Sequence, residues 1–256
     1  MTDTPQFKRT NMSRSGSTAT LALASDKVNS LDREVLLEIS SFVEYCEQEN
    51  GIGALVLTGE GSVFSAGLNV TEVLSNDRAY TDDLLDALHD ALVRLFRCPK
   101  PTVAAINGAA IAGGCLLAAA CDKRIIAEEA RIGVTELRVG VSFPVVAIEL
   151  LKHACGSDAE QLIFDAELLD AEAACRSGLA HETFPRFELS AAAIAAAEKL
   201  ASLDASAYAL AKASLRRQAL ASMEDDGSTV LDAQVREHWK DDHTRANLEK
   251  LLKPRS

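Results

Sequence analysis

The 256-residue chain lacks the residue patterns of several large protein classes. Its six cysteines include no Cys-x-x-Cys pair, and its five histidines include no pair four residues apart, so we expect no metal site. A serine hydrolase is not supported, because no Gly-x-Ser-x-Gly motif occurs. The 26 basic residues are outnumbered by 38 acidic ones and form no cluster, and the net charge is −12. This balance argues against a nucleic-acid partner.

A secretory signal is also missing from the N-terminal segment. Residues 1–20 contain no apolar stretch of the kind that such signals carry. Lys8, Arg9 and Arg14 among serines and threonines resemble a transit peptide only faintly, because Asp3 and the lack of an amphipathic pattern oppose it. Several cysteines stand in apolar surroundings, as reduced core thiols do. The sequence therefore predicts a cytoplasmic protein in a reducing compartment.

One long segment, Val103–Cys121, carries no charge at all. A membrane span needs about 20 apolar residues, and this segment would have to carry Asn107 and three glycines across the bilayer. A buried strand at Val103–Ile106, a turn, and a helix that opens at Gly113-Gly114 fit the residues better. A helix start leaves backbone N–H groups free to bind negative charge, so a ligand oxygen is expected there.

The rest of the chain alternates between strand and helix patterns. Strands are predicted at Thr18–Leu23, Ala54–Thr58, Lys123–Ala127 and 131–134, and helices after an N-cap at Ser30 and at Asp82–Arg97, Pro144–Ala154 and Asp158–Phe164. A strand–strand–helix unit thus recurs about every 45–50 residues, which is typical of a repeat or spiral architecture. From Leu189 the chain becomes alanine-rich helix with a charged tail. We expect a core over residues 1–195 and a helical region over 196–256 that packs on the core or on another subunit.

Three features of the sequence point to chemistry. The turn Phe64–Leu68 follows a strand and presents the Leu68 N–H, and Gly113 presents another at a helix start. Two such donors aimed at one carbonyl oxygen form an oxyanion hole, in which one donor is worth roughly 10²–10³ in rate. Glu136 stands between apolar residues, and desolvation there would raise its pKa and suit it to proton transfer.

Each feature also has a simpler interpretation. The Gly113-Gly114 pair is explained equally by close packing of a helix on a strand. Glu136 alone is compatible with a solvated residue or an ion pair with Arg138. Gly59-x-Gly61 followed by Gly67 lacks the third glycine and the lysine of a phosphate-binding loop, so a nucleotide site is weakly supported.

At these residues the chain resembles the crotonase (enoyl-CoA hydratase/isomerase) superfamily. The matching pieces fall in family order between Thr18 and Phe184: Val28-Asn29-Ser30-Leu31, Ala54–Gly59, Val63-Phe64-Ser65-Ala66-Gly67-Leu68-Asn69, Ala105-Ile106-Asn107-Gly108, Ala112-Gly113-Gly114-Cys115 and Cys121–Ile125. The resemblance implies an α/β fold, a spiral of ββα repeats with a C-terminal helical trimerisation region, assembled as a homotrimer or dimer of trimers.

The resemblance also implies an acyl-CoA substrate and no metal or redox cofactor, since the coenzyme A thioester is itself the substrate. The Leu68 and Gly113 N–H groups would hold the thioester carbonyl, and Glu136 would be catalytic. The substrate-binding residues implied by position are Asp26, Lys27, Val28, Ala66, Gly67 and Leu116.

The choice of reaction depends on two departures from the hydratase pattern. Hydratases of this superfamily carry a glutamate where this chain has Leu116, and a Pro-Gly-Ala-Gly-Gly loop where it has Val141–Pro144. Moving a double bond from C3 to C2 needs only one base, so the sequence predicts a Δ3,Δ2-enoyl-CoA isomerase of fatty-acid β-oxidation. Asn69 departs from the aspartate expected in such isomerases. The alternatives are a hydratase that takes a second acid from Glu72–Asp86, another crotonase-family enzyme, and a non-catalytic acyl-CoA binding protein.

Overall fold

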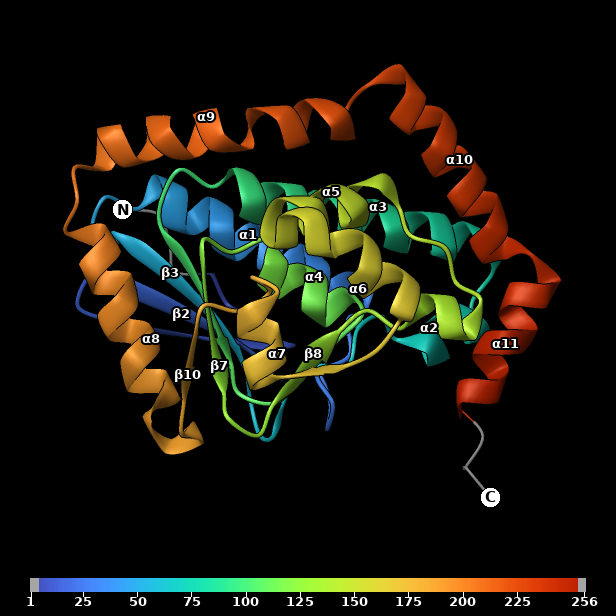
Figure 1. Cartoon of the computed structure of the whole chain (residues 1–256), viewed down its shortest axis with the longest axis horizontal. Helices are drawn as coiled ribbons and strands as arrows, with labels where there is room; N and C mark the ends of the chain where they lie inside the picture. The colour runs from blue at the N-terminus through green and yellow to red at the C-terminus, as the bar shows by residue number, and fades with distance from the viewer. Residues whose placement is uncertain (1–4, 253–256) are drawn as a thin grey trace.

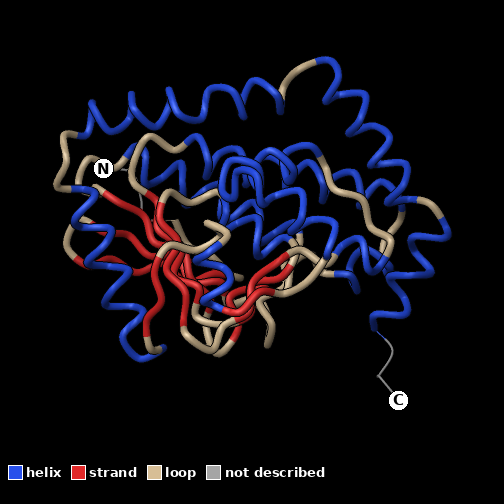
Figure 2. Tube along the Cα trace, viewed as in Figure 1, coloured by secondary structure: helices blue, strands red, loops and turns tan. Residues whose placement is uncertain are grey.

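The fold is built on two β-sheets, in a computed structural model that describes residues 5–252. The larger sheet has the order β1-β2-β3-β5-β7-β10; β1 and β2 pair antiparallel and every other pair is parallel. Its strands are β1 (Thr10–Ser15), β2 (Thr18–Leu23), β3 (Ala54–Gly59), β5 (Thr102–Ile106), β7 (Lys123–Ala127) and β10 (Glu182–Phe184). In Figure 2 these strands gather at the lower left of the molecule, with α8 along their outer side and most other helices above them and to the right.

The smaller sheet has the order β4-β6-β8-β9. Its strands are β4 (Val63–Ser65), β6 (Ala109–Ile111), β8 (Arg131–Gly133) and β9 (Leu169–Asp170), with the first three parallel and β9 antiparallel to β8. Each of β4, β6 and β8 follows a strand of the larger sheet in the chain, so the sequence passes repeatedly from one sheet to the other and then into helix. This is the spiral of strand–strand–helix units that the sequence predicts.

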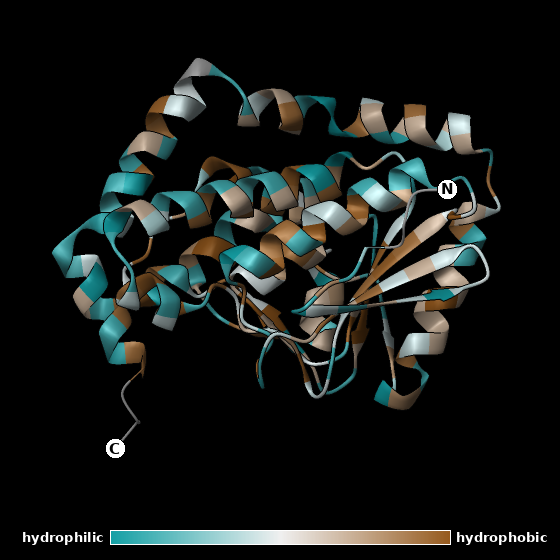
Figure 3. Ribbon diagram, turned by 180° about the vertical axis from the view of Figure 1, so that it is seen from behind, coloured by the Kyte–Doolittle hydropathy of each residue, from teal (hydrophilic) through white to brown (hydrophobic). Residues whose placement is uncertain are grey.

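Helices fill the space beside the sheets and wrap around the core (Figure 1). They are α1 (Arg33–Gln48), α2 (Val70–Ser75), α3 (Arg78–Arg97), α4 (Gly113–Ala119), α5 (Val145–Cys155), α6 (Ala159–Asp165), α7 (Ala171–Arg176), α8 (Arg186–Ala201), α9 (Ala205–Met223), α10 (Asp226–Lys240) and α11 (Asp242–Leu252), with 3₁₀ turns η1 (Glu136–Val139) and η2 (Gly156–Asp158). Figure 3 shows hydrophobic residues along the sheet strands and a mixed surface on α9.

The chargeless segment lies at the centre of the molecule. Every residue of β5 and of α4 is buried, which explains the absence of charge in both elements. The predicted strand, turn and helix are confirmed, and β6 forms within the predicted turn. None of the helices in residues 5–252 is both long enough and apolar enough to cross a membrane.

Several predicted boundaries are wrong, and side-chain hydrogen bonds explain why. Ser30 does not cap the first helix: its hydroxyl bonds Asp26, and Leu31 still pairs with Leu68 as a β-bridge. Asp32 is the cap, and it accepts from the Val35 N–H at 2.9 Å.

Other boundaries move by a few residues. The helix expected from Asp82 begins at Arg78 after the Asp77 cap, and the one expected from Leu189 begins at Arg186 after Pro185. The elements β1, β6, β9, β10, α2 and α7 were not predicted. Strand β1 is mostly polar and exposed, and the others are two to six residues long, too brief for a periodic pattern to be distinguished from loop.

The C-terminal helices α10 and α11 return to the core. Lys240 of α10 pairs with Asp82 of α3 at 3.0 Å, and the Arg245 guanidinium of α11 donates to the Val73 and Leu74 carbonyls of α2 at 3.0 and 3.1 Å. These contacts place α10 and α11 against α3 and α2, next to the segments between residues 66 and 144. Helices α10 and α11 therefore pack on the core, which is one of the two arrangements that the sequence left open for this region.

Candidate active site

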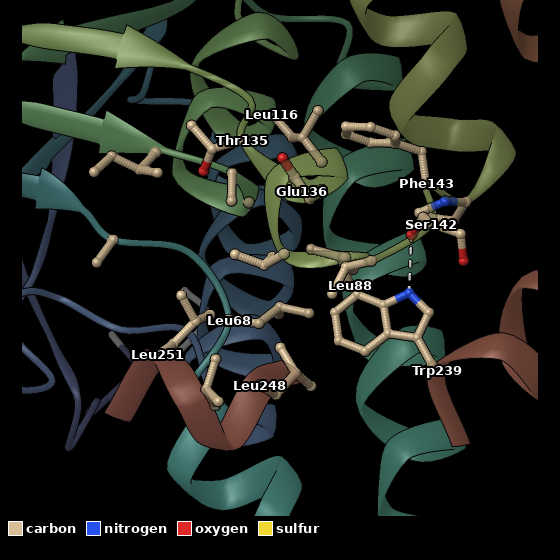
Figure 4. Close-up of a pocket in the computed structure, with 18 residues that line it drawn as sticks. Leu68, Leu88, Leu116, Thr135, Glu136, Ser142, Phe143, Trp239, Leu248 and Leu251 are labelled. Carbon is tan, nitrogen blue, oxygen red and sulfur yellow. Dashed lines mark hydrogen bonds between the residues drawn. The ribbon is translucent and has the colours of Figure 1, made fainter. Parts of the chain in front are cut away.

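A cavity of about 240 Å³ lies between α4, the turn η1 and the C-terminal helices. Most of its lining is apolar, and Figure 4 shows these side chains converging from distant parts of the chain. The lining residues are Ala66, Leu68, Val70, Leu88, Ile111, Ala112, Gly113, Leu116, Thr135, Glu136, Val139, Val141, Ser142, Phe143, Pro144, Trp239, Leu248 and Leu251. The structure thus brings five predicted site residues together here: Ala66, Leu68, Gly113, Leu116 and Glu136.

Two backbone amides lie beside each other at the wall of the cavity. A Cβ atom placed on Gly67 would lie 3.1 Å from the Gly113 nitrogen, and one placed on Gly113 would lie 3.7 Å from the Leu68 nitrogen, so these amides are neighbours. Among residues 5–252, neither N–H donates to a recorded backbone or side-chain acceptor. Gly113 is the first residue of α4, where helix geometry leaves the N–H free. Two such donors suit an oxygen that carries developing negative charge.

Backbone strain next to these amides fixes their direction. Ala112 has φ +52° and ψ −121°, a conformation that a residue with a Cβ rarely adopts. It is held by a hydrogen bond of 3.0 Å from its N–H to the Gly133 carbonyl. Gly67, on the opposite side, has φ +88°, and any side chain there would collide with Ala112. Such strain, of order 1–3 kcal/mol per residue, concentrates at functional sites.

The packing interpretation of the Gly113-Gly114 pair is confirmed for its second residue, Gly114. A Cβ on Gly114 would lie 2.4 Å from the Ser65 carbonyl oxygen, so Gly114 is required for close packing of α4 on β4. A Cβ on Gly113 would have its closest contact with the Leu31 side chain, at 3.2 Å, and Gly113 itself lines the cavity.

Glu136 supplies the only carboxylate among the lining residues of the cavity. The residue as a whole is half-buried, but its Oε2 atom is buried and accepts no hydrogen bond. Burial raises the pKa of Glu136 to about 7, against the opposing effect of the backbone amides of Glu136 and Thr135. A carboxyl group with a pKa near neutrality can both take and return a proton at physiological pH.

The structure shows neither an ion pair between Glu136 and Arg138 nor a second acid from the segment Glu72–Asp86 beside Glu136. Arg138 is directed to Glu167, whose Oε1 lies 3.0 Å from its guanidinium, so the proposed pair with Glu136 does not form. No acid of the segment Glu72–Asp86 lines the cavity. Asp77 caps α3 and Asp82 binds Lys240, so two of these acids serve structural contacts instead.

Three of the predicted substrate-binding residues lie in a loop next to the cavity but do not line it. Asp26, Lys27 and Val28 are exposed, and the Val28 carbonyl accepts from the Ala66 N–H at 3.0 Å. The Asp26 carboxylate receives the Val28 and Ser30 N–H groups at 2.9 and 3.1 Å, which shapes this loop. Gly67 is buried beneath the amides rather than in contact with the cavity.

Residues from α10 and α11 complete the cavity, and sequence reasoning did not predict them. Trp239, Leu248 and Leu251 line it, although they lie more than 100 residues from Glu136. The only tryptophan of the chain, in an otherwise charged tail, was the available signal. Its large apolar ring needed a place in a core or a pocket.

Comparison with known proteins decides the family. The chain matches the family described as Enoyl-CoA hydratase/isomerase over residues 14–251. The protein belongs to that family. The predicted crotonase-type fold is thereby confirmed, and acyl-CoA thioesters are the substrates on which this family acts.

Relatives of both reaction types are similar to this chain. Human mitochondrial enoyl-CoA delta isomerase 1 is 31% identical over 203 residues, which cover 78% of this chain and 67% of that protein. A Thermus thermophilus protein provisionally named as an enoyl-CoA hydratase is 36% identical over 182 residues, 69% of this chain and 71% of its own. The crystal structure of human mitochondrial Δ3,Δ2-enoyl-CoA isomerase superposes with a TM-score of 0.89 at 27% identity, over 96% of this chain and 97% of the other.

Proposed function

We propose that the protein is a Δ3,Δ2-enoyl-CoA isomerase, which converts 3-enoyl-CoA into trans-2-enoyl-CoA without a metal or redox cofactor. The observation that carries this proposal is the single carboxylate, Glu136, in a cavity where Leu116 is buried at the place of a hydratase's second glutamate. Hydration is helped by two groups that hold and activate water, whereas a double-bond shift needs one group that moves a proton.

In the proposed reaction the thioester oxygen receives the Leu68 and Gly113 N–H groups. Ionised Glu136 removes a proton from C2, and the electron pair of that bond spreads over C2, C3, C4 and the thioester oxygen as a dienolate. The two amides stabilise the negative charge on the oxygen. Protonated Glu136 then returns the proton to C4, which leaves the double bond between C2 and C3 and restores the carboxylate.

The apolar lining supports this assignment. Leu116 is 2% exposed and occupies volume that a bound water would otherwise use. A dry site keeps the dienolate from being quenched by solvent and strengthens the amide–oxygen contacts. The exposed loop of Asp26, Lys27 and Val28 would lie beside the pantetheine and ADP parts of coenzyme A, and the helices after residue 195 would form a homotrimer.

The product distribution tests the proposal. Purified protein is incubated with 3-hexenoyl-CoA and, in parallel, with crotonyl-CoA. We expect 2-hexenoyl-CoA from the first and little 3-hydroxybutyryl-CoA from the second. Hydration of crotonyl-CoA faster than isomerisation would support the hydratase alternative, and tight binding of both thioesters without turnover would support the acyl-CoA binding protein.

A further inference from the structure

The cavity has two ends with different chemistry. In Figure 4, Leu116, Thr135 and Glu136 lie together at one side, while Ser142, Phe143 and Trp239 lie at the other. The first end holds the carboxylate, and the residues that carry the free amides, Leu68 and Gly113, also line the cavity. Side chains at the second end are hydrocarbon or aromatic, apart from Ser142. An acyl chain whose carbonyl sits at the amides, as in the proposed function on which this inference rests, would extend toward the second end.

Trp239 forms a fixed part of that second end. It is 7% exposed, and its indole N–H donates to the Ser142 carbonyl at 2.9 Å, drawn as the dashed line in Figure 4. A second hydrogen bond joins the same helix to the same segment, from the Val145 N–H to the Asp232 carboxylate at 2.8 Å. Two anchors between α10 and residues 142–145 hold the ring in place, so it is a poor candidate for displacement by a long chain.

The volume of the cavity limits what can fit in front of this ring. About 240 Å³ accommodates about eight groups of the size of a water molecule. The thioester carbon and oxygen take two of these places. The remainder holds about six further carbons, since a methylene is similar in size to water.

We propose that Trp239 limits the length of the acyl chain and that the protein prefers enoyl-CoA thioesters of about six to eight carbons. Longer chains would have to displace the indole from Ser142 or fold back toward the entrance. Trp239 is thus a specificity-determining residue contributed by the C-terminal region, far in sequence from the reacting groups.

Binding of saturated acyl-CoA thioesters tests the proposal without any turnover. Isothermal titration calorimetry gives the dissociation constants for the wild type and for every variant. In the wild type, the fluorescence of Trp239, the only tryptophan, also reports contact with the acyl chain. From butanoyl- to octanoyl-CoA the dissociation constant should fall about fourfold per methylene, the equivalent of the burial of one CH₂ group. Beyond about eight carbons it should stop falling, and the fluorescence change should appear only as the chain approaches that length.

Three variants of α10 sharpen the test. The break is the chain length at which the dissociation constant stops falling. Trp239→Ala should move the break to chains that are several carbons longer. The same variant should raise the ratio of kcat/KM for 3-dodecenoyl-CoA to kcat/KM for 3-hexenoyl-CoA at least about tenfold. Trp239→Phe keeps a ring and should produce a smaller move in the same direction. Val230→Ala, at a position 59% exposed on the same helix, should leave the break where it is. Thermal melts establish that each variant is folded, and Trp239→Phe carries the test if Trp239→Ala does not fold.

The outcomes separate this inference from the proposed function. A break that stays at the same length in folded Trp239→Phe and Trp239→Ala would overturn the role of Trp239, as would equal turnover of the two thioesters by the wild type. If no enoyl-CoA is isomerised but the break moves as expected, the isomerase proposal fails and the chain-length limit stands.

Discussion

Asp122 and Glu136 are both largely removed from water, yet their surroundings differ completely. Asp122 accepts from Lys212 and Arg216 at 2.7 Å each, and from the N–H and hydroxyl of Thr102 at 2.8 and 3.1 Å. Glu136 has a buried oxygen with no partner. The first carboxylate ties α9 to the start of β5, and the second keeps an oxygen atom without a hydrogen-bond partner in the wall of the cavity. Burial alone therefore does not mark a reactive acid; burial without partners does.

The largest expected contrast is in turnover. Glu136→Gln should lower the turnover of 3-enoyl-CoA on the order of 10²–10⁴-fold, the usual worth of a general base, while acyl-CoA binding survives. Asp122→Asn, the matched change at the other site, should leave turnover per folded molecule close to that of the wild type. Steady-state kinetics on both proteins checks this, and similar losses in both would remove the distinction between the two carboxylates.

The next contrast is in stability. Asp122→Asn leaves two nearly buried cations, Lys212 and Arg216, without their counter-charge. Loss of one partner from a buried ion pair costs about 3–5 kcal/mol of unfolding free energy. Urea denaturation at matched protein concentration should show this loss for Asp122→Asn and no such loss for Glu136→Gln. An Asp122→Asn protein as stable as the wild type would show that the cluster does not hold α9.

The third contrast is in how stability depends on pH. Here the substitution of Glu136 should stabilise the folded state, whereas the substitution of Asp122 destabilises it. The folded state raises the pKa of this carboxyl from an ordinary 4.5 to about 7, so between these values it binds a proton that the unfolded chain does not. The wild type should therefore lose stability as the pH rises from 4.5 to 7, by up to about 3 kcal/mol. Glu136→Gln lacks this loss, and above pH 7 it should be more stable than the wild type in the same denaturation assay. Equal stability of the two proteins at pH 5 and pH 8 would contradict the raised pKa.

The smallest predicted effect is the pH dependence of the wild-type reaction. Because the ionised form of Glu136 takes the proton, kcat/KM should rise about tenfold per pH unit up to about pH 7 and then level off. A profile that is flat from pH 5 to pH 8 would mean that Glu136 titrates in its ordinary range or takes no part.

Local sequence indicated which residues meet around Glu136, because the patterns that mark them are short-range. The chargeless run fixed β5 and α4, and the glycine turns at Gly67 and Gly113 placed two amides beside each other. Glu136 was recognisable from its apolar neighbours. The acyl-chain end was not predictable in this way, since Trp239, Leu248 and Leu251 reach the cavity only through packing of α10 and α11 on α3 and α2. The Lys240–Asp82 ion pair and the Arg245 hydrogen bonds that dock these helices join residues more than 150 positions apart.

Transfer of an isotopic label tests the central claim most directly. The substrate is 3-hexenoyl-CoA with both hydrogens at C2 replaced by deuterium, and the position of deuterium in the 2-enoyl product is measured at short reaction times. If one shielded carboxyl group moves the proton, the product keeps one deuterium at C2 and carries a measurable part of the other at C4. Deuterium wholly lost to solvent, with only ordinary hydrogen at C4, would contradict a single proton carrier at Glu136.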